Sequence, residues 1–360
     1  MLHIFSIGSD RHLLDPSSRA FKRISEYASL VSTYTVFVFS YTKKEQIEQK
    51  NFRVVPVFGK NKFSQIIALC RVIKIECQSK SRKEIVLSSQ DPFEIGLICL
   101  TLSWIFGLRL HIQVHTEFFS SFFKQESFRQ RVQSIIAPFV LKKAKSIRVV
   151  SKHIKEFLVS VLRINEELVF VAPVFVARSE EMLISKKQNK IVFVGRFEKV
   201  KNFERLIASF EILASRLPEL RLEIFGEGSL KTQITKRISK SAYKERIAIF
   251  PFQNNPFEVM SQASAFVISS DYEGYAMTAV ESVMSGTPVC MTPVGCAYEF
   301  IQDGVNGFVS PGFSIPDFAK TLEKTLKFPF RQEELERSLH TLLTKEEYFK
   351  ILVHSWNKAL

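Results

Sequence analysis

The sequence has few cysteines, and their arrangement argues against two common uses of this residue. Five cysteines, an odd number, are scattered through 360 residues. Cys70 and Cys77 are seven residues apart and share one face of a helix, which is not the spacing of a zinc site or of a disulfide framework. We therefore expect reduced thiols in the core of a cytoplasmic protein.

The sequence also lacks a long hydrophobic run. The longest apolar stretch, Ile95–Leu108, is shorter than the ~20 residues that span a bilayer, and Glu94 and Arg109 bracket it. Met1–Gly8 is predicted to be a short strand, because it has neither the basic start nor the long apolar run of a signal peptide. Repeats, low-complexity tracts and nucleic-acid-binding motifs are absent as well.

Negative charge is scarce in the first half of the chain. Residues 1–175 carry 26 Lys and Arg against 14 Asp and Glu, a net charge of +12, whereas residues 176–360 carry 24 against 22, a net charge of +2. Such an excess favours an anionic partner, and the candidates are a membrane surface, nucleic acid or an acidic acceptor. Five phenylalanines lie next to basic segments in this half: Phe118, Phe119, Phe122, Phe123 and Phe128. Aromatic rings beside cations are typical of a face that meets a lipid-linked acceptor at a membrane. The alternative is that half of these phenylalanines belong to the core and that the charged segments are solvated faces.

Strand-like and helix-like segments alternate along the whole chain, which implies parallel sheets with right-handed crossovers. The predicted strands are Leu2–Ile7, Tyr34–Phe39, Phe52–Val57, Ile85–Ser88, Leu110–Val114, Ser146–Val150, Lys190–Val194, Arg221–Phe225, Ile247–Phe250, Ala265–Ile268, Pro288–Met291 and Gly307–Val309. The predicted helices are Arg19–Leu30, Phe63–Gln78, Phe93–Phe106, Arg129–Lys143, Asn202–Arg216, Leu230–Ser239, Pro256–Gln262, Ala276–Met284 and Glu346–Leu360.

A chain of this length favours two domains, each with its own core. We place the boundary near residues 172–179. This gives an N-terminal Rossmann-like domain over residues 1–175, a C-terminal Rossmann-like domain over 176–345 and a terminal helix over 346–360. The apolar stripe of that helix is compatible with packing on either domain.

The most informative segment runs from Ser269 to Thr292 and contains two glutamates, Glu273 and Glu281, eight residues apart. Glu273 lies where a buried strand gives way to a helix, and Glu281 lies two turns inside that helix. The unpaired amides at such a helix start bind phosphate or a polarised sugar oxygen. Carboxylates accept hydrogen bonds from sugar diols. The segment therefore offers the groups that hold a nucleotide sugar.

Two cations follow another predicted strand. Arg196 comes directly after Gly195 at the end of Lys190–Val194, and Lys201 follows before the next helix. Arg presents a bidentate fork and Lys a point charge, so the pair suits a diphosphate leaving group. A solvated loop with two charges is the structural alternative.

Together these motifs resemble the retaining family 4 glycosyltransferases of bacteria, which have the GT-B fold. The matching residues are Glu273-x7-Glu281 with Gly286-Thr287-Pro288-Val289 after it, and Gly195-Arg196 with Lys201-Asn202. The resemblance spans most of the chain and is strongest in residues 190–309. It implies two parallel α/β domains that face each other across a cleft, and a C-terminal helix that crosses back to the N-terminal domain.

The resemblance also implies roles for single residues. The predicted donor site comprises Gly8, Gly195, Arg196, Lys201, Gly226, Phe252, Glu273, Gly274, Tyr275, Ala276, Met277 and Glu281. Arg196 and Lys201 hold the diphosphate, and Glu281 accepts from the ribose diol. Glu273 and the amides of Gly274–Met277 hold sugar hydroxyls and phosphate oxygens. Four positions remain. The backbone of Gly8 lines the phosphates, that of Gly226 the nucleotide pocket and that of Phe252 the base, and Gly195 precedes Arg196 in the matching motif.

His115 completes the predicted catalytic set with Glu273, Arg196 and Lys201. It follows the strand Leu110–Val114, so it lies at a carboxyl end, where ligands of parallel sheets bind. Its imidazole is expected to hydrogen-bond either a donor hydroxyl or the phosphate near the reacting carbon. A purely structural histidine is the alternative.

The expected function is transfer of a hexose from a nucleoside-diphosphate sugar to an acceptor hydroxyl with retention of configuration, in polysaccharide, lipopolysaccharide or glycolipid synthesis. We expect a UDP-sugar rather than a GDP-sugar and no metal, because fixed cations neutralise the leaving group. The expected acceptor is a sugar or a lipid-linked sugar. The basic half favours an anionic membrane and not nucleic acid, which places the enzyme in the cytoplasm, peripheral on the inner face of the plasma membrane. The alternatives are an epimerase or hydrolase of the same fold and a non-catalytic basic binding protein.

Overall fold

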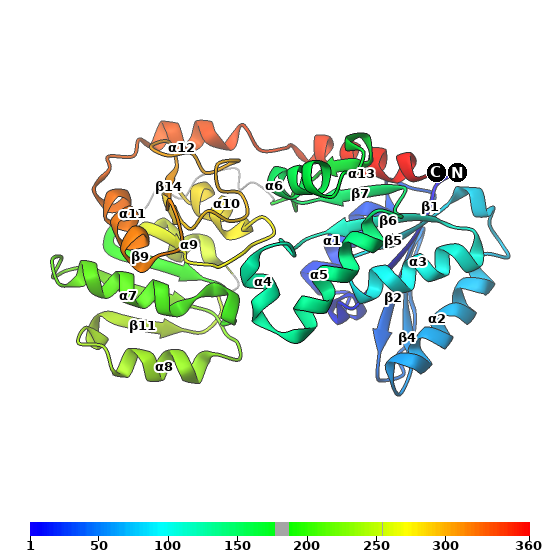
Figure 1. The fold of residues 1–360 in the computed structure, drawn as a ribbon, viewed down its shortest axis with the longest axis horizontal. Helices are drawn as coiled ribbons and strands as arrows, with labels where there is room; N and C mark the ends of the chain where they lie inside the picture. Colours follow the sequence, from blue (N-terminus) through cyan, green and yellow to red (C-terminus); the bar gives the residue numbers. More distant parts are fainter. Residues whose placement is uncertain (177–186, 254) are drawn as a thin grey trace. The chain divides into compact units, whose positions relative to one another are not determined.

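Two parallel sheets organise the structure, a computed structural model that describes residues 1–176, 187–253 and 255–360 (Figure 1). The chain divides into two units. The first unit comprises Met1–Phe118, Phe128–Pro173 and Lys345–Leu360, and the second comprises Phe119–Ser127 and Val174–Thr344. Of the boundary expected near residues 172–179, the part from 177 onward lies outside the described residues.

The first unit contains an eight-stranded sheet in the order β3-β4-β2-β1-β5-β6-β7-β8. The strands are β1 (His3–Gly8), β2 (Thr33–Ser40), β3 (Ile47–Gln49), β4 (Phe52–Phe58), β5 (Ile85–Ser89), β6 (Arg109–Val114), β7 (Ser146–Val149) and β8 (Val169–Val171). All neighbours pair in parallel except β3, which runs antiparallel to β4 at the edge. All residues of β1 are buried, as expected for a central strand that has helices on both faces.

Helices cover both faces of this sheet because the crossovers run in two directions from β1 and β5. They are α1 (Arg19–Ala28), α2 (Lys62–Glu76), α3 (Glu94–Phe106), α5 (Phe128–Leu141), α6 (Lys152–Glu156) and α13 (Lys345–Ala359). The sequence specifies several of their ends. Asn61 and Ser64 form a capping box at the start of α2, and Gly107, in the left-handed region at φ 67°, ends α3.

The C-terminal helix α13 packs on the first unit, at β6, β7 and β8. Its buried residues Tyr348, Leu352, Ser355, Trp356 and Ala359 recur at helical spacing and form one stripe. Trp356 packs against Tyr34 of β2, with the ring centroids 5.8 Å apart. The predicted return of the last helix to the N-terminal domain is therefore confirmed.

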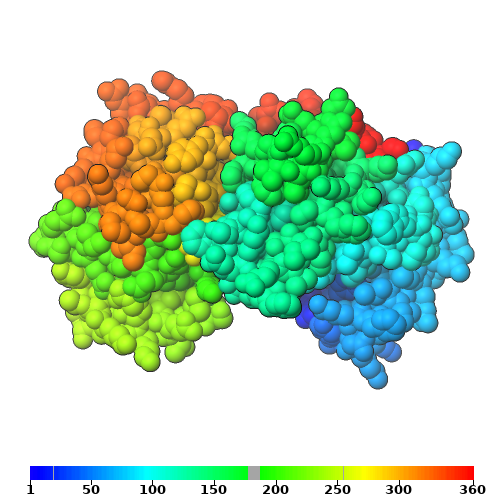
Figure 2. All heavy atoms as spheres, viewed as in Figure 1, coloured from blue at the N-terminus to red at the C-terminus, as the bar shows by residue number. Residues whose placement is uncertain are grey.

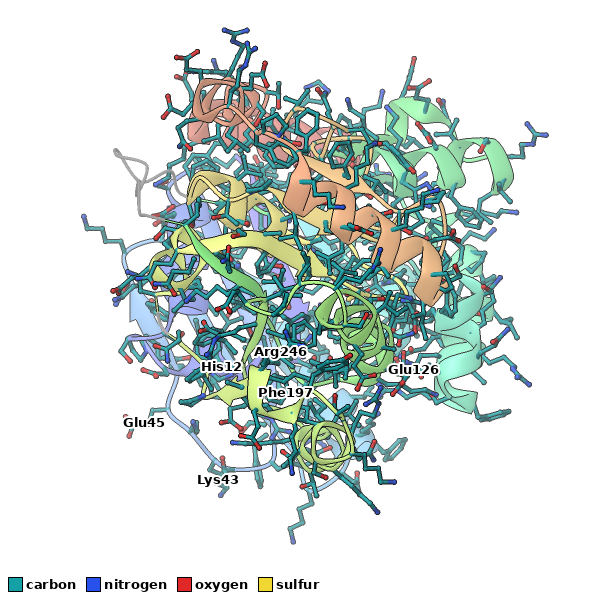
Figure 3. The ribbon with its side chains drawn as sticks, turned by 90° about the vertical axis from the view of Figure 1, so that its left-hand side faces the viewer. His12, Lys43, Glu45, Glu126, Phe197 and Arg246 are labelled. Atoms are coloured by element: carbon teal, nitrogen blue, oxygen red, sulfur yellow. The ribbon has the colours of Figure 1, made fainter. Side chains whose placement is uncertain are left out.

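The second unit contains a six-stranded parallel sheet in the order β11-β10-β9-β12-β13-β14. The strands are β9 (Gln188–Val194), β10 (Arg221–Phe225), β11 (Ile247–Phe250), β12 (Ala263–Ile268), β13 (Val289–Met291) and β14 (Gly307–Val309). Its helices are α4 (Ser121–Glu126), α7 (Phe203–Ala214), α8 (Lys231–Ser239), α9 (Pro256–Ser261), α10 (Met277–Met284), α11 (Ile315–Lys327) and α12 (Gln332–Leu339). Its apolar core is continuous across the sheet and includes Phe197, which lies among the strands and helices in Figure 3.

The five phenylalanines expected to form a membrane face do not form one continuous surface. Phe118 and Phe123 are buried, and only Phe128 is strongly exposed. Phe118 packs on Phe93 and Phe157, because a large ring next to a strand end fills the core beneath it. The exposed apolar side chains of this region lie instead on α3 and α5: Leu97, Trp104, Ile105, Phe128, Val132, Ile135 and Phe139.

Candidate functional site

The candidate site lies where the strand order of the second sheet reverses. From β9 the chain proceeds outward to β10 and β11, and it then returns to β12 on the other side of β9. The crossovers leave β9 and β12 in opposite directions, and ligands of open parallel sheets bind beyond the carboxyl ends of the strands at such a switch point. Gly195 follows β9, and the loop 269–276 follows β12.

Lys201 and Glu273 meet at this point. Lys201 Nζ lies 2.6 Å from Glu273 Oε1, and the two side chains are 19% and 16% exposed. Ser270 Oγ donates to the same carboxylate oxygen over 2.7 Å. Two residues predicted from separate motifs, 72 positions apart, therefore form one half-buried ion pair.

A second polar network fixes the loop that carries Glu273. Arg205 of α7 is buried, and its guanidinium donates to the Ser269 carbonyl over 2.6 Å and to the Asp271 carboxylate over 2.9 Å. Asn202 Nδ2 also donates to Asp271, over 2.9 Å. The Ser269 hydroxyl returns a hydrogen bond of 2.7 Å to the Lys201 carbonyl. These hydrogen bonds join the segment that carries Lys201 to the loop that carries Glu273.

Helix α10 begins directly after this loop without a side-chain cap. Its N-cap residue, Ala276, has a left-handed φ of 68°, a conformation that costs an alanine about 1 kcal/mol. Gly295, at φ 60°, lies so close that an added Cβ would stand 2.7 Å from the Tyr275 carbonyl oxygen. The N-cap side chain of α10 thus accepts no hydrogen bond from the first amides of the helix, and amides at a helix start are groups that bind phosphate.

Tyr275 contributes its backbone to this region, because its side chain is buried. Burial raises the pKa of the Tyr275 phenol, so the ring is a neutral part of the core. Its carbonyl accepts a hydrogen bond of 2.8 Å from the Cys296 amide. Glu281 is half-buried and lies in α10 as expected, but about one turn inside the helix and not two, because α10 begins at Met277. The helix ends before Gly286, which has a φ of 70°.

Arg196 does not join the Lys201–Glu273 pair. Its side chain is 78% exposed, and its guanidinium contacts Glu198 over 2.8 Å. Gly195 and Gly226 bring two strand ends together: a Cβ on Gly226 would stand 1.9 Å from the Gly195 carbonyl oxygen. Phe252 follows β11 and is exposed, next to Phe250, which stacks on Phe225 with the ring centroids 4.7 Å apart.

His115 and Gly8 lie in the first unit, at the ends of β6 and β1. His115 Nε2 lies 3.3 Å from Gln113 Oε1. Burial and the nearby Arg148 and Arg23 lower the pKa of this histidine to about 3, so its ring is neutral at physiological pH. Gly8 faces Gln90, which follows β5: a Cβ on Gly8 would stand 2.2 Å from Gln90 Oε1.

Sequence reasoning missed the residues that support the site. Ser270 and Asp271 lie inside the segment Ser269–Thr292 but were given no role, although the polar run Ser269–Asp271 between a buried strand and Glu273 was a usable signal. Arg205 belongs to no motif that we singled out. The segment Phe119–Ser127 was also missed. It packs on the second unit, where Tyr272 donates a hydrogen bond to Glu126 and its ring meets Phe123 at 5.4 Å. A small cavity of about 180 Å³ lies here, between α4 and the residues 199–200 and 271–272.

Comparison with known proteins shows similarity to glycosyltransferases. The family model described as glycosyl transferases group 1 matches residues 177–339. Mannosylfructose-phosphate synthase of Agrobacterium fabrum is 29% identical over 160 residues, which are 41% of this chain and 34% of that protein. Poly(glycerol-phosphate) alpha-glucosyltransferase of Bacillus subtilis is 23% identical over 145 residues, 40% of this chain and 22% of that protein. The matched part of the chain therefore covers well under two thirds of these relatives.

Solved structures resemble the chain over nearly its full length. Sucrose-phosphate synthase from Thermosynechococcus elongatus superposes with a TM-score of 0.79 at 13% identity and covers 99% of this chain and 98% of its own. A lipopolysaccharide outer core galactosyltransferase in its apo form gives 0.75 at 17% identity over the whole of both chains. The predicted GT-B fold and the resemblance to bacterial glycosyltransferases are confirmed, and glycosyltransferases are the enzyme class that the motifs predict.

Two further properties concern the described residues alone. Among residues 1–176, 187–253 and 255–360, no group of three His, Cys, Asp or Glu side chains is arranged to hold a metal ion. Within the same ranges, no helix is long and apolar enough to cross a membrane. All five cysteines are free thiols, and four of them are buried.

Proposed function

We propose that this protein is a retaining glycosyltransferase of family 4 that transfers a sugar from a nucleoside-diphosphate donor to an acceptor hydroxyl. The observation that carries the proposal is the Lys201–Glu273 pair beside the uncapped start of α10, at the switch point of a parallel sheet. This arrangement combines a cation and backbone amides for phosphate with a carboxylate for sugar hydroxyls. The second unit is accordingly the donor domain, and the first is the acceptor domain.

In the proposed reaction, the acceptor oxygen bonds to the anomeric carbon while the bond from that carbon to the diphosphate oxygen breaks. Attack and departure on the same face retain the configuration, and the leaving phosphate oxygen takes the acceptor proton. Lys201, Arg196 and the α10 amides stabilise the departing charge. Glu281 accepts from the ribose diol, and His115 contacts the sugar or phosphate near the reacting carbon. These fixed cations make a metal unnecessary.

The names of two relatives support a polymer acceptor and α-linked products: poly(glycerol-phosphate) alpha-glucosyltransferase and poly(ribitol-phosphate) alpha-N-acetylglucosaminyltransferase. We infer that the acceptor is a cell-surface polysaccharide, a lipopolysaccharide, a polyol-phosphate polymer or its lipid-linked precursor. Four similar solved structures contain UDP, which favours a UDP-sugar here. A cytoplasmic enzyme on the inner face of the membrane fits such a substrate.

The diphosphate clamp is tested by substitution once a thermal-shift screen of nucleotide sugars has identified a stabilising donor. We expect Lys201→Ala and Arg196→Ala each to lower turnover roughly a hundredfold or more, while melting curves show folded protein. Lys199→Ala is the matched control, because Lys199 lies two residues from Lys201 and is exposed. Full activity of both site variants would place the clamp elsewhere.

The products distinguish the reaction classes. A retained anomeric configuration in the NMR spectrum of the product supports the proposal, and an inverted one contradicts it. Sugar release that is equally fast without acceptor indicates a hydrolase, and a changed sugar on the nucleotide indicates an epimerase. Activity should survive a chelator; complete loss that added magnesium restores would contradict the metal-free mechanism.

A further inference from the structure

We propose that Arg148 and Gln113 are positioning residues that hold His115 in the tautomer with its proton on Nε2. Both are buried in the first unit, on β7 and β6, and they are direct partners in the strand pairing. Gln113 lies two residues before His115, near the end of β6, and Arg148 belongs to no motif that the proposed function uses. Together they connect His115 to the C-terminal helix α13.

Arg148 fixes the orientation of the Gln113 amide. Its guanidinium donates to Gln113 Oε1 over 2.8 Å, to the Ala172 carbonyl over 3.0 Å and to the Tyr348 hydroxyl over 3.1 Å. A guanidinium has donors only. The atom of Gln113 that faces it must therefore be the carbonyl oxygen, and the amide nitrogen must point the other way.

The far side of Gln113 agrees with this orientation. Gln113 Nε2 donates to Ser88 Oγ over 3.3 Å, and Ser88 Oγ lies 2.9 Å from His111 Nδ1. His111 Nε2 lies 3.4 Å from Ser355 Oγ, whose proton is used for the Leu352 carbonyl over 2.7 Å. His111 must donate to Ser355 and accept from Ser88. The donor and acceptor roles are then consistent at every hydrogen bond from Ser355 of α13 to Gln113.

His115 is the last member of this chain. Its Nε2 faces Gln113 Oε1, which is already an acceptor for Arg148, so Nε2 must carry the proton. Because burial and the two neighbouring arginines lower the pKa of the ring, Nδ1 stays unprotonated. In the described part of the first unit, the His115 ring forms its hydrogen bond with the Gln113 side chain.

For the proposed function, the tautomer distinguishes between the two contacts expected of His115, a sugar hydroxyl and a phosphate oxygen. An unprotonated Nδ1 accepts a hydrogen bond from a hydroxyl but cannot donate one to a phosphate oxygen. If the protein is a glycosyltransferase, His115 therefore contacts a sugar hydroxyl and not the diphosphate. This last step rests on the proposed function, whereas the tautomer does not.

The test is the ring 15N NMR spectrum of His115 in the ligand-free full chain, assigned by comparison with a His115→Gln sample. We expect a protonated Nε2 and an unprotonated Nδ1 at neutral pH. In Arg148→Met the Gln113 amide is free to turn, so the signature of a protonated Nδ1 should appear; Arg148→Lys, which restores a donor, should recover the original pattern. Arg23→Met is the matched control, because it removes a nearby exposed charge that donates no hydrogen bond to Gln113.

Three results would overturn the proposal: a protonated Nδ1 in the wild-type ring, an imidazolium at neutral pH, or an unchanged pattern in folded Arg148→Met. If Arg148→Met does not fold, the wild-type and Arg148→Lys spectra still test the tautomer: a protonated Nδ1 in either would contradict the proposal. The measurement needs no substrate, so its outcome is independent of whether the protein transfers sugars.

Discussion

At the scale of residues, two opposite charges of the candidate site form an ion pair with each other. Lys201 and Glu273 are assigned to different parts of the donor, yet in the structure they bind each other over 2.6 Å. An isolated half-buried charge is costly, and pairing offsets that cost. We infer that a bound donor replaces the contact between Lys201 and Glu273 with two others: Lys201 contacts the diphosphate, and Glu273 contacts a sugar diol. Neither side chain is then left unpaired.

Glu281 gives the first prediction at this scale. Glu281→Ala should weaken binding of the free nucleoside diphosphate by about 1–3 kcal/mol, because the ribose diol loses a half-buried acceptor. Isothermal calorimetry measures the effect, and Glu281→Gln, which keeps one acceptor oxygen, should retain part of the affinity. The 2′,3′-dideoxy nucleotide is the control: the variant and the wild type should bind it equally. A similar loss with and without the diol would refute the ribose assignment.

His111 predicts a pH dependence of stability. Burial lowers its pKa from 6.5 to about 3. Between these values the unfolded chain binds a proton that the folded protein excludes, so the free energy of unfolding falls as the pH falls, by up to about 1.4 kcal/mol per pH unit. His115 acts in the same direction.

Urea unfolding at about pH 7 and about pH 5 measures this dependence. His111→Gln should have a lower stability at neutral pH, because it loses the Ser88 contact, but a smaller loss on acidification. His340→Gln is the control, because His340 is exposed on the second unit. Equal acid sensitivity of His111→Gln and the wild type would contradict the assignment.

At the scale of elements, the sequence predicted the regular parts of both sheets. The apolar-rich runs Arg221–Phe225 and Ile247–Phe250 have the bounds expected for β10 and β11. Two short edge strands, β3 and β8, were missed, because three-residue strands with mixed burial carry no periodic signal. Helices α11 and α12 were missed although α11 starts with Ser314 and a proline in its first turn, which are recognisable start signals.

Of the candidate site, only the residues that belong to recognisable motifs could be predicted from the sequence. Strand ends that carry Gly195, Lys201 and Glu273 can be inferred from the alternation of segments, because carboxyl ends of parallel strands share one edge. The pairing of Lys201 with Glu273 and the packing of Phe119–Ser127 on the second unit depend on tertiary contacts between distant segments. Local pattern carries no information on such contacts.

Glycine geometry gives the prediction for elements. Gly226 and Gly107 both have a positive φ, of 149° and 67°, but a Cβ on Gly226 meets the Gly195 carbonyl oxygen at 1.9 Å, whereas a Cβ on Gly107 meets no heavy atom within 4 Å. Gly107→Ala should cost about 1 kcal/mol from backbone strain alone. Gly226→Ala should cost more, because the β9 and β10 ends must separate, and it should also abolish donor binding.

Thermal melts and calorimetry with the nucleoside diphosphate compare these two variants. Gly107→Ala serves as the matched control for positive φ, and it should bind the nucleotide as the wild type does. Equal destabilisation by the two substitutions, or unchanged nucleotide affinity in Gly226→Ala, would show that the close approach of the two turns is not needed for the site.

At the scale of the whole molecule, charge and exposed apolar surface are concentrated in the first half of the chain. The net charge is +12 over residues 1–175 and +2 over residues 176–360. The exposed side chains of α5, Phe128, Val132, Ile135 and Phe139, recur at helical spacing and form one stripe. Atoms of α5 are visible on the surface in Figure 2. Lys142, Lys143 and Lys145 follow the helix directly and are exposed. A stripe of this kind with adjacent cations is typical of an interfacial helix that lies on an anionic membrane.

We predict salt-sensitive binding to anionic liposomes without insertion. Each cation near such a surface contributes about 1 kcal/mol, and salt screens the attraction beyond about 8–10 Å. Replacing Lys142, Lys143 and Lys145 with glutamate should release the protein into the supernatant of a co-sedimentation assay while calorimetry shows unchanged nucleotide affinity. The matched control carries the same charge change on exposed lysines of the second unit, Lys236, Lys240 and Lys244, and should still sediment. Equal sedimentation with neutral and anionic vesicles, insensitive to salt, would remove the electrostatic argument. If both triple variants stay in the supernatant, the net charge of the protein determines vesicle binding and not this particular surface.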